Sequence, residues 1–191
     1  MRRYWIYGLG IILIAAAVTA AVLATNNFKN HDDKLANSSA SKTKQTPPAG
    51  KNACSIFTLA DAKQLLGDTA KGGISPIYTS TTDFDVSTCS YTQDQGANAP
   101  VSSKKAATLL MQAPKTETGI ASNLKEFGPL KPVGVQDLTG YGDQSYWDPE
   151  HGQMSVLKDN VWYILSLGPN TPSNRTLDDA KRLADLIISK M

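Results

Sequence analysis

Histidine and cysteine are scarce in this chain of 191 residues, which has two of each. One histidine, His31, lies in a polar stretch, so a zinc site around the other would need unusual ligands. The sequence also lacks a Gly-x-Ser-x-Gly nucleophile elbow, a phosphate-binding glycine loop before a helical pattern, and the carboxylate spacing of a calcium loop. We therefore expect no metal and no cofactor, and no motif here predicts catalysis.

Positive charge is also scarce in the part of the chain that can form a core. Residues 53–191 carry 12 Lys and Arg against 15 Asp and Glu, a net charge of −3. The whole chain nevertheless has a net charge of +2, because residues 1–52 are basic. Nucleic-acid binding requires a basic surface on the folded part. We therefore expect no nucleic-acid partner.

Charge is absent altogether from the 21 residues Tyr4 to Ala24, which follow Met1-Arg2-Arg3. As a helix rising about 1.5 Å per residue, this run would be roughly 31 Å long, which matches the hydrocarbon core of a bilayer. It predicts one transmembrane helix in a signal-anchor segment, residues 1–24. A cleaved signal ending at Ala24 is the alternative, although the apolar part of such signals is usually about 7–15 residues. No cysteine lies near the end of the run, which excludes a lipid-modified N-terminus.

Basic residues flank the apolar run on both sides, so their number alone does not set its orientation. Arg2 and Arg3 precede the run, and Lys29, Lys34 and Lys42 follow it. Two arginines before an apolar stretch are typical of an export signal. We therefore expect a single-pass protein of the cell membrane, with its C-terminal domain outside the cytoplasm.

Polar residues dominate the stretch after the apolar run, residues 25–52, where Phe28 and Leu35 are the only large apolar side chains. Such a composition cannot form a core, and it predicts a disordered polar linker. The remaining 139 residues, 53–191, have the usual size of one domain. We expect them to form a single extracytoplasmic domain.

Both cysteines, Cys54 and Cys89, fall within this domain. Two is the number that one disulfide requires, and disulfides persist in the oxidising space outside the cytoplasm. We expect a Cys54–Cys89 disulfide, with two separate buried thiols as the alternative. The disulfide would support the outside location independently of the flanking charges.

Three helices are indicated by capping residues and by apolar periodicity. Thr58 and Asp61 have capping-box spacing before a helix over 59–66. A second helix is predicted over 117–127, and a third, with an apolar stripe, from Thr176 to the C-terminus. The predicted apolar face of the second helix consists of Ile120, Ala121, Leu124 and Phe127.

Strand-like runs occupy the rest of the domain. The dipeptide Asp159-Asn160 predicts a two-residue hairpin turn, because both residue types tolerate positive φ. Both alternating sets of residues 161–165 are apolar, which predicts a central strand covered on both faces. We expect an α+β domain with a mostly antiparallel sheet of about five or six strands and about three helices packed on it. The predicted strands are 88–92, 104–113, 133–138, 144–147, 153–158 and 161–167.

Four stretches of the domain share a pattern with a known group of proteins. They are Cys54 to Gly67, Cys89 to Tyr91, Gly142 to Trp147 and Val161 to Gly168, followed by a closing helix rich in Ala, Leu and Ile. Together they resemble small exported or membrane-anchored bacterial domains of unknown function that are common among actinobacterial lipoproteins. The resemblance implies a PsbP/Mog1-like α+β fold, and it transfers no catalytic residue.

One dense polar cluster lies between two strand-like runs, within Gly142 to Gly152. Carboxylates beside an imidazole can act as acid and base or hold a metal, but Asp-Pro-Glu-His-Gly is also what a hairpin turn requires. The aromatic side chains Tyr141 and Tyr146 are those most expected to reach the surface nearby. A binding surface, if there is one, is therefore predicted at Tyr141, Tyr146, Asp148, Glu150 and His151.

The sequence favours a non-catalytic binding or accessory function, because it predicts an anchor, a linker and a small domain without recognisable catalytic residues. The expected partners are the membrane, through the N-terminal helix, and an envelope protein or a small-molecule ligand. One alternative is a cell-envelope hydrolase that uses the acidic hairpin. Another is a pilin-like assembly subunit, although the glutamate expected early in its apolar segment is missing.

Overall fold

The computed structural model describes residues 52–72, 77–96, 100 and 103–191. The chain divides into two units, 1–43 and 44–191, and every description below concerns the second. The predicted membrane segment, 1–24, and almost all of the predicted linker lie outside the described residues. Within the described part, no helix is both long enough and apolar enough to cross a membrane.

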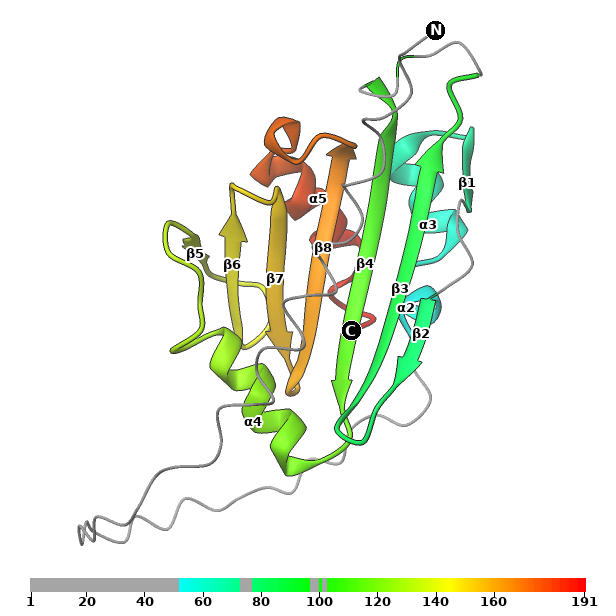
Figure 1. Ribbon diagram of the computed structural model, residues 1–191. Coiled ribbons are helices and arrows are strands. Elements are labelled where there is room, and N and C mark those ends of the chain that lie inside the picture. The colour runs from blue at the N-terminus through cyan, green and yellow to red at the C-terminus, as the bar shows by residue number, and fades with distance from the viewer. Residues whose placement is uncertain (1–51, 73–76, 97–99, 101–102) are drawn as a thin grey trace, which may run out of the picture. The chain divides into compact units, whose positions relative to one another are not determined.

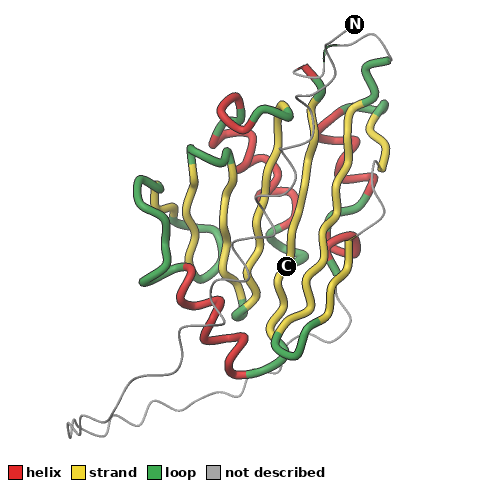
Figure 2. Tube along the Cα trace, in the orientation of Figure 1, coloured by secondary structure: helices red, strands yellow, loops and turns green. Residues whose placement is uncertain are grey.

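The centre of the described unit is one antiparallel sheet (Figures 1 and 2). Its strands follow the order β1-β3-β4-β8-β7-β6-β5, and β2 pairs with β3 beside β1. The hairpin β3–β4 and the meander β5 to β8 meet where β4 pairs with β8. The strands are β1 (Ala70–Gly72), β2 (Ile77–Ser80), β3 (Phe84–Gln93), β4 (Lys105–Pro114), β5 (Gln136–Leu138), β6 (Gln144–Asp148), β7 (Gln153–Lys158) and β8 (Val161–Pro169).

Helices cover the two faces of this sheet unequally (Figure 1). Helices α2 (Ala53–Ile56), α3 (Leu59–Leu66) and α5 (Leu177–Ile187) pack on one face. Of the helices that the structure describes, only α4 (Glu117–Glu126) lies on the other face, near one end. A short 3-10 helix, η3 (Pro172–Asn174), connects β8 to α5.

The main core lies between the sheet and the three helices. Alternation along each strand directs every second side chain toward them, as with Leu109 of β4 and Leu165 of β8. Leu183 and Ile187 of α5 are fully buried in the same core. Burying each such side chain contributes roughly 1.5–3 kcal/mol.

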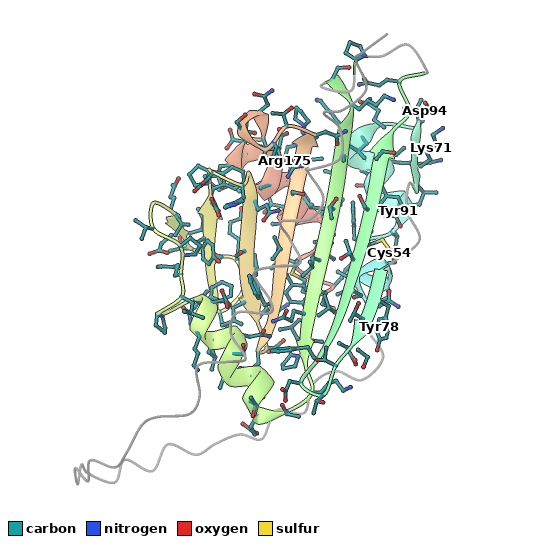
Figure 3. All side chains as sticks on the ribbon, viewed as in Figure 1. Cys54, Lys71, Tyr78, Tyr91, Asp94 and Arg175 are labelled. Atoms are coloured by element: carbon teal, nitrogen blue, oxygen red, sulfur yellow. A yellow bond between two sulfur atoms is a disulfide. The ribbon has the colours of Figure 1, made fainter. Side chains whose placement is uncertain are left out.

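The disulfide between Cys54 and Cys89 is present, with 5.0 Å between the two Cα atoms (Figure 3). It ties α2 to β3. Beside it, the Ala53 N–H donates to the Ser87 hydroxyl over 2.9 Å, and the Tyr91 hydroxyl donates to the Phe57 carbonyl over 3.3 Å. The start of the described chain is thus attached to the sheet by a covalent bond and by hydrogen bonds.

The α+β class and the largely antiparallel sheet are confirmed, but the predicted numbers of strands and helices were too low. Within the described residues the sheet has eight strands, and α2 adds a fourth α-helix. The missed elements are short: β1 has three residues, and β2 and α2 have four each. Pairing with β3 stabilises β1 and β2, and a short segment shows no periodicity of its own.

The meander confirms two predictions about turns and strand placement. Asp159 and Asn160 have φ values of 52° and 66°, as a hairpin of two residues requires. Strand β8 is central, between β4 and β7. Its second face is only partly covered, because α4 reaches Trp162 through Phe127 but leaves Ile164 half-buried.

The predicted apolar face of α4 was right for Phe127, which is buried, and wrong for Ala121 and Leu124, which are exposed. Gly119 and Asn123 are the buried residues of the helix itself. Asn123 is fully buried, and its amide group donates to the carbonyls of Gln112 and Asn160. Hydrogen bonds and close backbone approach, rather than apolar periodicity, therefore orient this helix.

The capping box at the start of α3 is confirmed and also binds the C-terminal region. The Asp61 carboxylate accepts from the Thr58 N–H over 2.9 Å and from the Lys190 ammonium over 2.6 Å. Burial raises the pKa of Asp61, but hydrogen bonds from Lys190 and Thr58 outweigh burial and hold this pKa below its ordinary value. Asp61 therefore stabilises the fold in its charged form.

We expect Asp61→Asn to lower the free energy of unfolding at pH 7 by about 1.5–3 kcal/mol, the scale of hydrogen bonds to a charged group. A carboxyl with a lowered folded pKa stabilises above its unfolded pKa, about 3.9, and loses this contribution as the pH falls through the folded value. Urea unfolding at pH 7 and pH 2.5 measures this, and the difference between the parent protein and the variant should be smaller at pH 2.5. A loss that is equal at both pH values would contradict the assignment.

Candidate functional site

The candidate site is the sheet face on which α4 is the only helix among the described residues, and we call it the open face. Alternation places its side chains opposite the main core, and most of them are half-buried. Among the described residues, this face carries hydroxyl, amide and apolar groups, with the carboxylate of Asp148 at its β6 end. The open face consists of Thr88 and Ser90 (β3), Thr108 and Leu110 (β4), Ile164 and Ser166 (β8), Gln153 and Ser155 (β7), and Tyr146 and Asp148 (β6).

A row of polar side chains crosses the open face from β3 to β6. Ser90 pairs with Thr108, and their hydroxyl oxygens are 2.9 Å apart. Thr108 pairs in turn with Ser166. Gln153, at the start of β7, continues the row to Asp148, with which it pairs. The row therefore offers neighbouring hydroxyl and amide groups to one ligand.

At the β6 end of this row, Asp148 organises the β6–β7 turn. One carboxylate oxygen accepts from the N–H groups of Glu150 and His151 over 3.0 and 3.2 Å. The other lies 2.7 Å from Nδ1 of His151. The Asp148 side chain is 14% exposed and the His151 side chain 63%. Asp148 is therefore engaged within the turn, and His151 presents its ring to solvent.

Tyr146 lies deeper than expected for a surface aromatic residue, since it is only 3% exposed. Its ring packs against Phe127 at 5.3 Å between centroids. Burial raises the pKa of the Tyr146 hydroxyl, with a smaller contribution from the charges of Glu126 and Asp148, and the hydrogen bond with Ser155 opposes them. Tyr146 is therefore buried beneath Phe127 rather than presented on the surface of the open face.

Glu126, at the end of α4, is a member of this region that the sequence did not indicate. It is half-buried, and burial raises the pKa of its carboxyl group. The sequence also did not indicate the hydroxyl groups of the polar row, because their proximity depends on strand pairing. Period-two alternation of Ser and Thr in β3 is the only signal that could have suggested them.

Two of the five predicted binding residues lie apart from the polar row. Tyr141 packs against the main core on the helix-covered side, where burial and the charge and hydrogen bond of Asp185 raise its pKa. Glu150 is exposed in the β6–β7 turn. The structure therefore brings Asp148 and His151 together at the β6–β7 turn, buries Tyr146 against Phe127 and places Tyr141 on the helix-covered side.

The chemistry available at the open face is hydrogen bonding. Across the described ranges, no group of three or more His, Cys, Asp or Glu side chains is arranged to hold a metal ion. The carboxylate of Asp148 already accepts hydrogen bonds from the turn. The hydroxyl and amide groups of the polar row therefore form a mostly uncharged surface.

The fold and this surface define an α+β domain with one helix-covered and one open sheet face. Comparison with known protein families, curated proteins and solved structures finds no match. The resemblance to actinobacterial lipoprotein domains and to the PsbP/Mog1-like fold stays a prediction.

Proposed function

We propose that this protein is a membrane-anchored binding or accessory protein whose extracytoplasmic domain binds a ligand through the open face and catalyses no reaction. The observation that carries the proposal is the row of hydroxyl and amide side chains that runs from Ser90 across five strands and ends at the carboxylate of Asp148. Antiparallel sheets commonly keep one face on the core and one toward solvent. The partly buried hydroxyl and amide groups on this face support binding of a ligand with matching groups.

The disulfide supports the proposed compartment. It joins the only two cysteines of the chain, and such bonds persist where the environment is oxidising. Together with the apolar run Tyr4 to Ala24, it favours a domain held at the outer surface of the cell membrane. The group resembled by the sequence includes exported and membrane-anchored domains, which agrees with this proposal.

The compartment is tested by adding protease to intact cells that produce the full chain. We expect the domain to be digested without lysis, and its cysteines to react with a thiol reagent only after reduction. A cytoplasmic protein serves as the control for cell integrity. Protection from protease until lysis, or free thiols in native cells, would overturn the proposed location.

The binding surface is tested by NMR with soluble oligosaccharide fragments of the cell wall as the probe. We expect amide shift changes on β4, β7 and β8, and their loss in Thr108→Arg, which places charge in the polar row. Thr171→Arg, at an exposed position beyond the end of β8, is the matched control and should leave the shifts unchanged. Shift changes confined to other surfaces, or turnover of the fragments, would contradict the proposal.

The hydrolase alternative gains no support from the acidic hairpin. A general acid or base needs a carboxylate free to exchange a proton with a substrate. Asp148 instead holds the turn, and Glu150 lies exposed beside it. We therefore put forward the binding function alone.

A further inference from the structure

Arg175, between η3 and α5, is a half-buried cation that has no acidic partner among the described residues. Its Nε donates to the Pro169 carbonyl oxygen over 3.0 Å. The N–H groups of its two Nη atoms have no hydrogen-bond partner in the described part of the chain. Arg182, the other arginine of the domain, pairs with Asp179 over 3.3 Å. The charge of Arg175 is therefore left without a counter-charge from the described fold.

The guanidinium group is partly withdrawn from water and yet remains accessible. Burial lowers the pKa of Arg175, and no neighbouring carboxylate charge opposes this effect. Taking a cation out of water costs free energy unless an anion or other polar groups replace the water. Among the described residues, the only fully buried side-chain nitrogen or oxygen without a partner is Nε1 of Trp162. The Nη atoms of Arg175 can therefore be reached by a ligand from solvent.

Two glycines make room for the aliphatic part of Arg175. A Cβ atom at Gly152, in the β6–β7 turn, would lie 2.9 Å from Cβ and 3.1 Å from Cδ of the arginine. A Cβ atom at Gly168, near the end of β8, would lie 3.3 Å from Cγ. The arginine is thus packed against two backbone segments and tied to Pro169 by Nε. A side chain held in this way loses little conformational entropy when it binds a ligand.

The same packing places Arg175 beside the polar row of the open face. Figure 3 shows Arg175 near the end of β8. Gly152 directly precedes Gln153, which belongs to the row. Gly168 follows Ser166 by two residues, so alternation along β8 puts both on the same side of the strand. A ligand that covers Gln153 and Ser166 therefore lies beside this guanidinium group.

We propose that Arg175 is an anion-binding site, which holds a carboxylate or phosphate group of the ligand whose uncharged part lies on the polar row. This inference deepens the proposed function and rests on it. The two Nη groups of a guanidinium form a planar fork that matches two oxygens of a carboxylate or a phosphate. The hydroxyl and amide groups of the row match the hydroxyl groups of a sugar. The ligand class is therefore an acidic or phosphorylated sugar.

The Asp148 carboxylate, in the same turn as Gly152, is engaged by other groups. One of its oxygens accepts from the N–H groups of Glu150 and His151, and the other lies 2.7 Å from Nδ1 of His151. Its charge does not contribute to the pKa of Arg175, which burial alone lowers. Asp148 therefore neither occupies the Nη groups of Arg175 nor supplies the missing counter-charge.

The anion site is tested with three matched sugars: glucose, glucuronate and glucose-6-phosphate. Each is titrated into the full chain in a nonionic detergent, and NMR follows the amides of the sheet and the Nε–H group of Arg175. We expect at least one anionic sugar to bind about tenfold more tightly than glucose, the scale of a hydrogen bond to a charged group. It should also shift the Arg175 resonance. The order of glucuronate and glucose-6-phosphate distinguishes a carboxylate from a phosphate ligand.

Substitutions of the two arginines of the domain separate a specific site from general charge attraction. Arg175→Gln should reduce the affinity for the anionic sugar to that for glucose, and leave glucose binding unchanged. Arg175→Lys keeps the charge without the planar fork and should retain only part of the preference. Arg182→Gln removes an exposed arginine of α5 and should change nothing. The amide spectrum of each variant shows whether its fold is intact, and the preference of the native protein needs no variant.

The outcomes separate the anion site from the proposed binding function. If all three sugars bind the open face equally, the binding function holds and the anion site is wrong. If anionic sugars bind through Arg175 but shift no amide of β3 or β4, the anion site stands and the polar row is wrong as the binding surface. If neither anionic sugar shifts Arg175 at millimolar concentration, or if Arg175→Gln keeps the preference, the anion site is overturned whether or not glucose binds.

Discussion

Replacing Cys54 and Cys89 together by alanine is expected to lower the free energy of unfolding by about 4 kcal/mol. The estimate follows from the chain entropy of an unfolded loop closed across a sequence separation of 35 residues. Such a loss is large relative to the whole stability of a small domain, which is usually about 5–15 kcal/mol. Urea unfolding of the fragment 44–191, followed by circular dichroism, measures it.

Reduction supplies the control for this prediction. A reductant should lower the urea midpoint of the parent fragment and leave that of the double-alanine variant unchanged. The attachment of α2 should weaken first, because the disulfide joins this helix to β3. Hydrogen exchange at Ala53 and Ile56 would then be faster than in the oxidised protein. Equal midpoints of the parent fragment with and without reductant would show that the bond contributes nothing.

Gly142→Ala is expected to lower the free energy of unfolding by about 3 kcal/mol or more. Gly142 has a φ of 64°, a conformation that costs other residues about 1–2 kcal/mol. An added Cβ would also collide with the Leu157 carbonyl oxygen and lie 2.8 Å from Cγ1 of Val156. Overpacking of this kind typically costs about 1–3 kcal/mol more. Urea unfolding of the fragment 44–191 measures the sum.

Gly140→Ala is the matched control for the steric part of this effect. Gly140 has a φ of 87°, and an added Cβ would meet nothing within 4 Å. Only the backbone strain should remain, at about 1–2 kcal/mol. The two variants therefore separate strain from collision. Equal losses for Gly140→Ala and Gly142→Ala would contradict the close approach of Gly142 to β7.

Local signals were sufficient for several elements of the fold. Helix α3 was predictable because Thr58 and Asp61 form a capping box within four residues. The β7–β8 turn was predictable because Asp159 and Asn160 accept positive φ. In both cases the determining contacts lie between near neighbours in the chain, so the residue types carry the information.

The predicted face of α4 was right for Phe127 but wrong for Ala121 and Leu124, because the packing of this helix depends on residues distant in sequence. Its apolar periodicity indicated a buried face that included Leu124, whereas the buried side carries Gly119 and Asn123. Asn123 is buried because Gln112 and Asn160 supply its hydrogen-bond partners. A polar residue can face the sheet only where such partners exist, and their position follows from strand pairing.

The candidate site was predicted in part for the same reason. Asp148 and His151 are three residues apart, and one turn brings them together. Ser90, Thr108 and Ser166 become neighbours only when β3, β4 and β8 pair in register. Tyr141, although close to Tyr146 in sequence, packs toward α5 and the main core.

The sequence by itself determined the α+β class, the three longer capped helices and the turn of β7–β8, because these follow from local residue types and periodicity. Its two cysteines also limited the disulfide to one pairing. Only the tertiary structure decided which sheet face stays open, which side of α4 points outward and which residues share the polar row. These features depend on the order and register of the strands, which bring together hydrogen-bonding groups far apart in the chain.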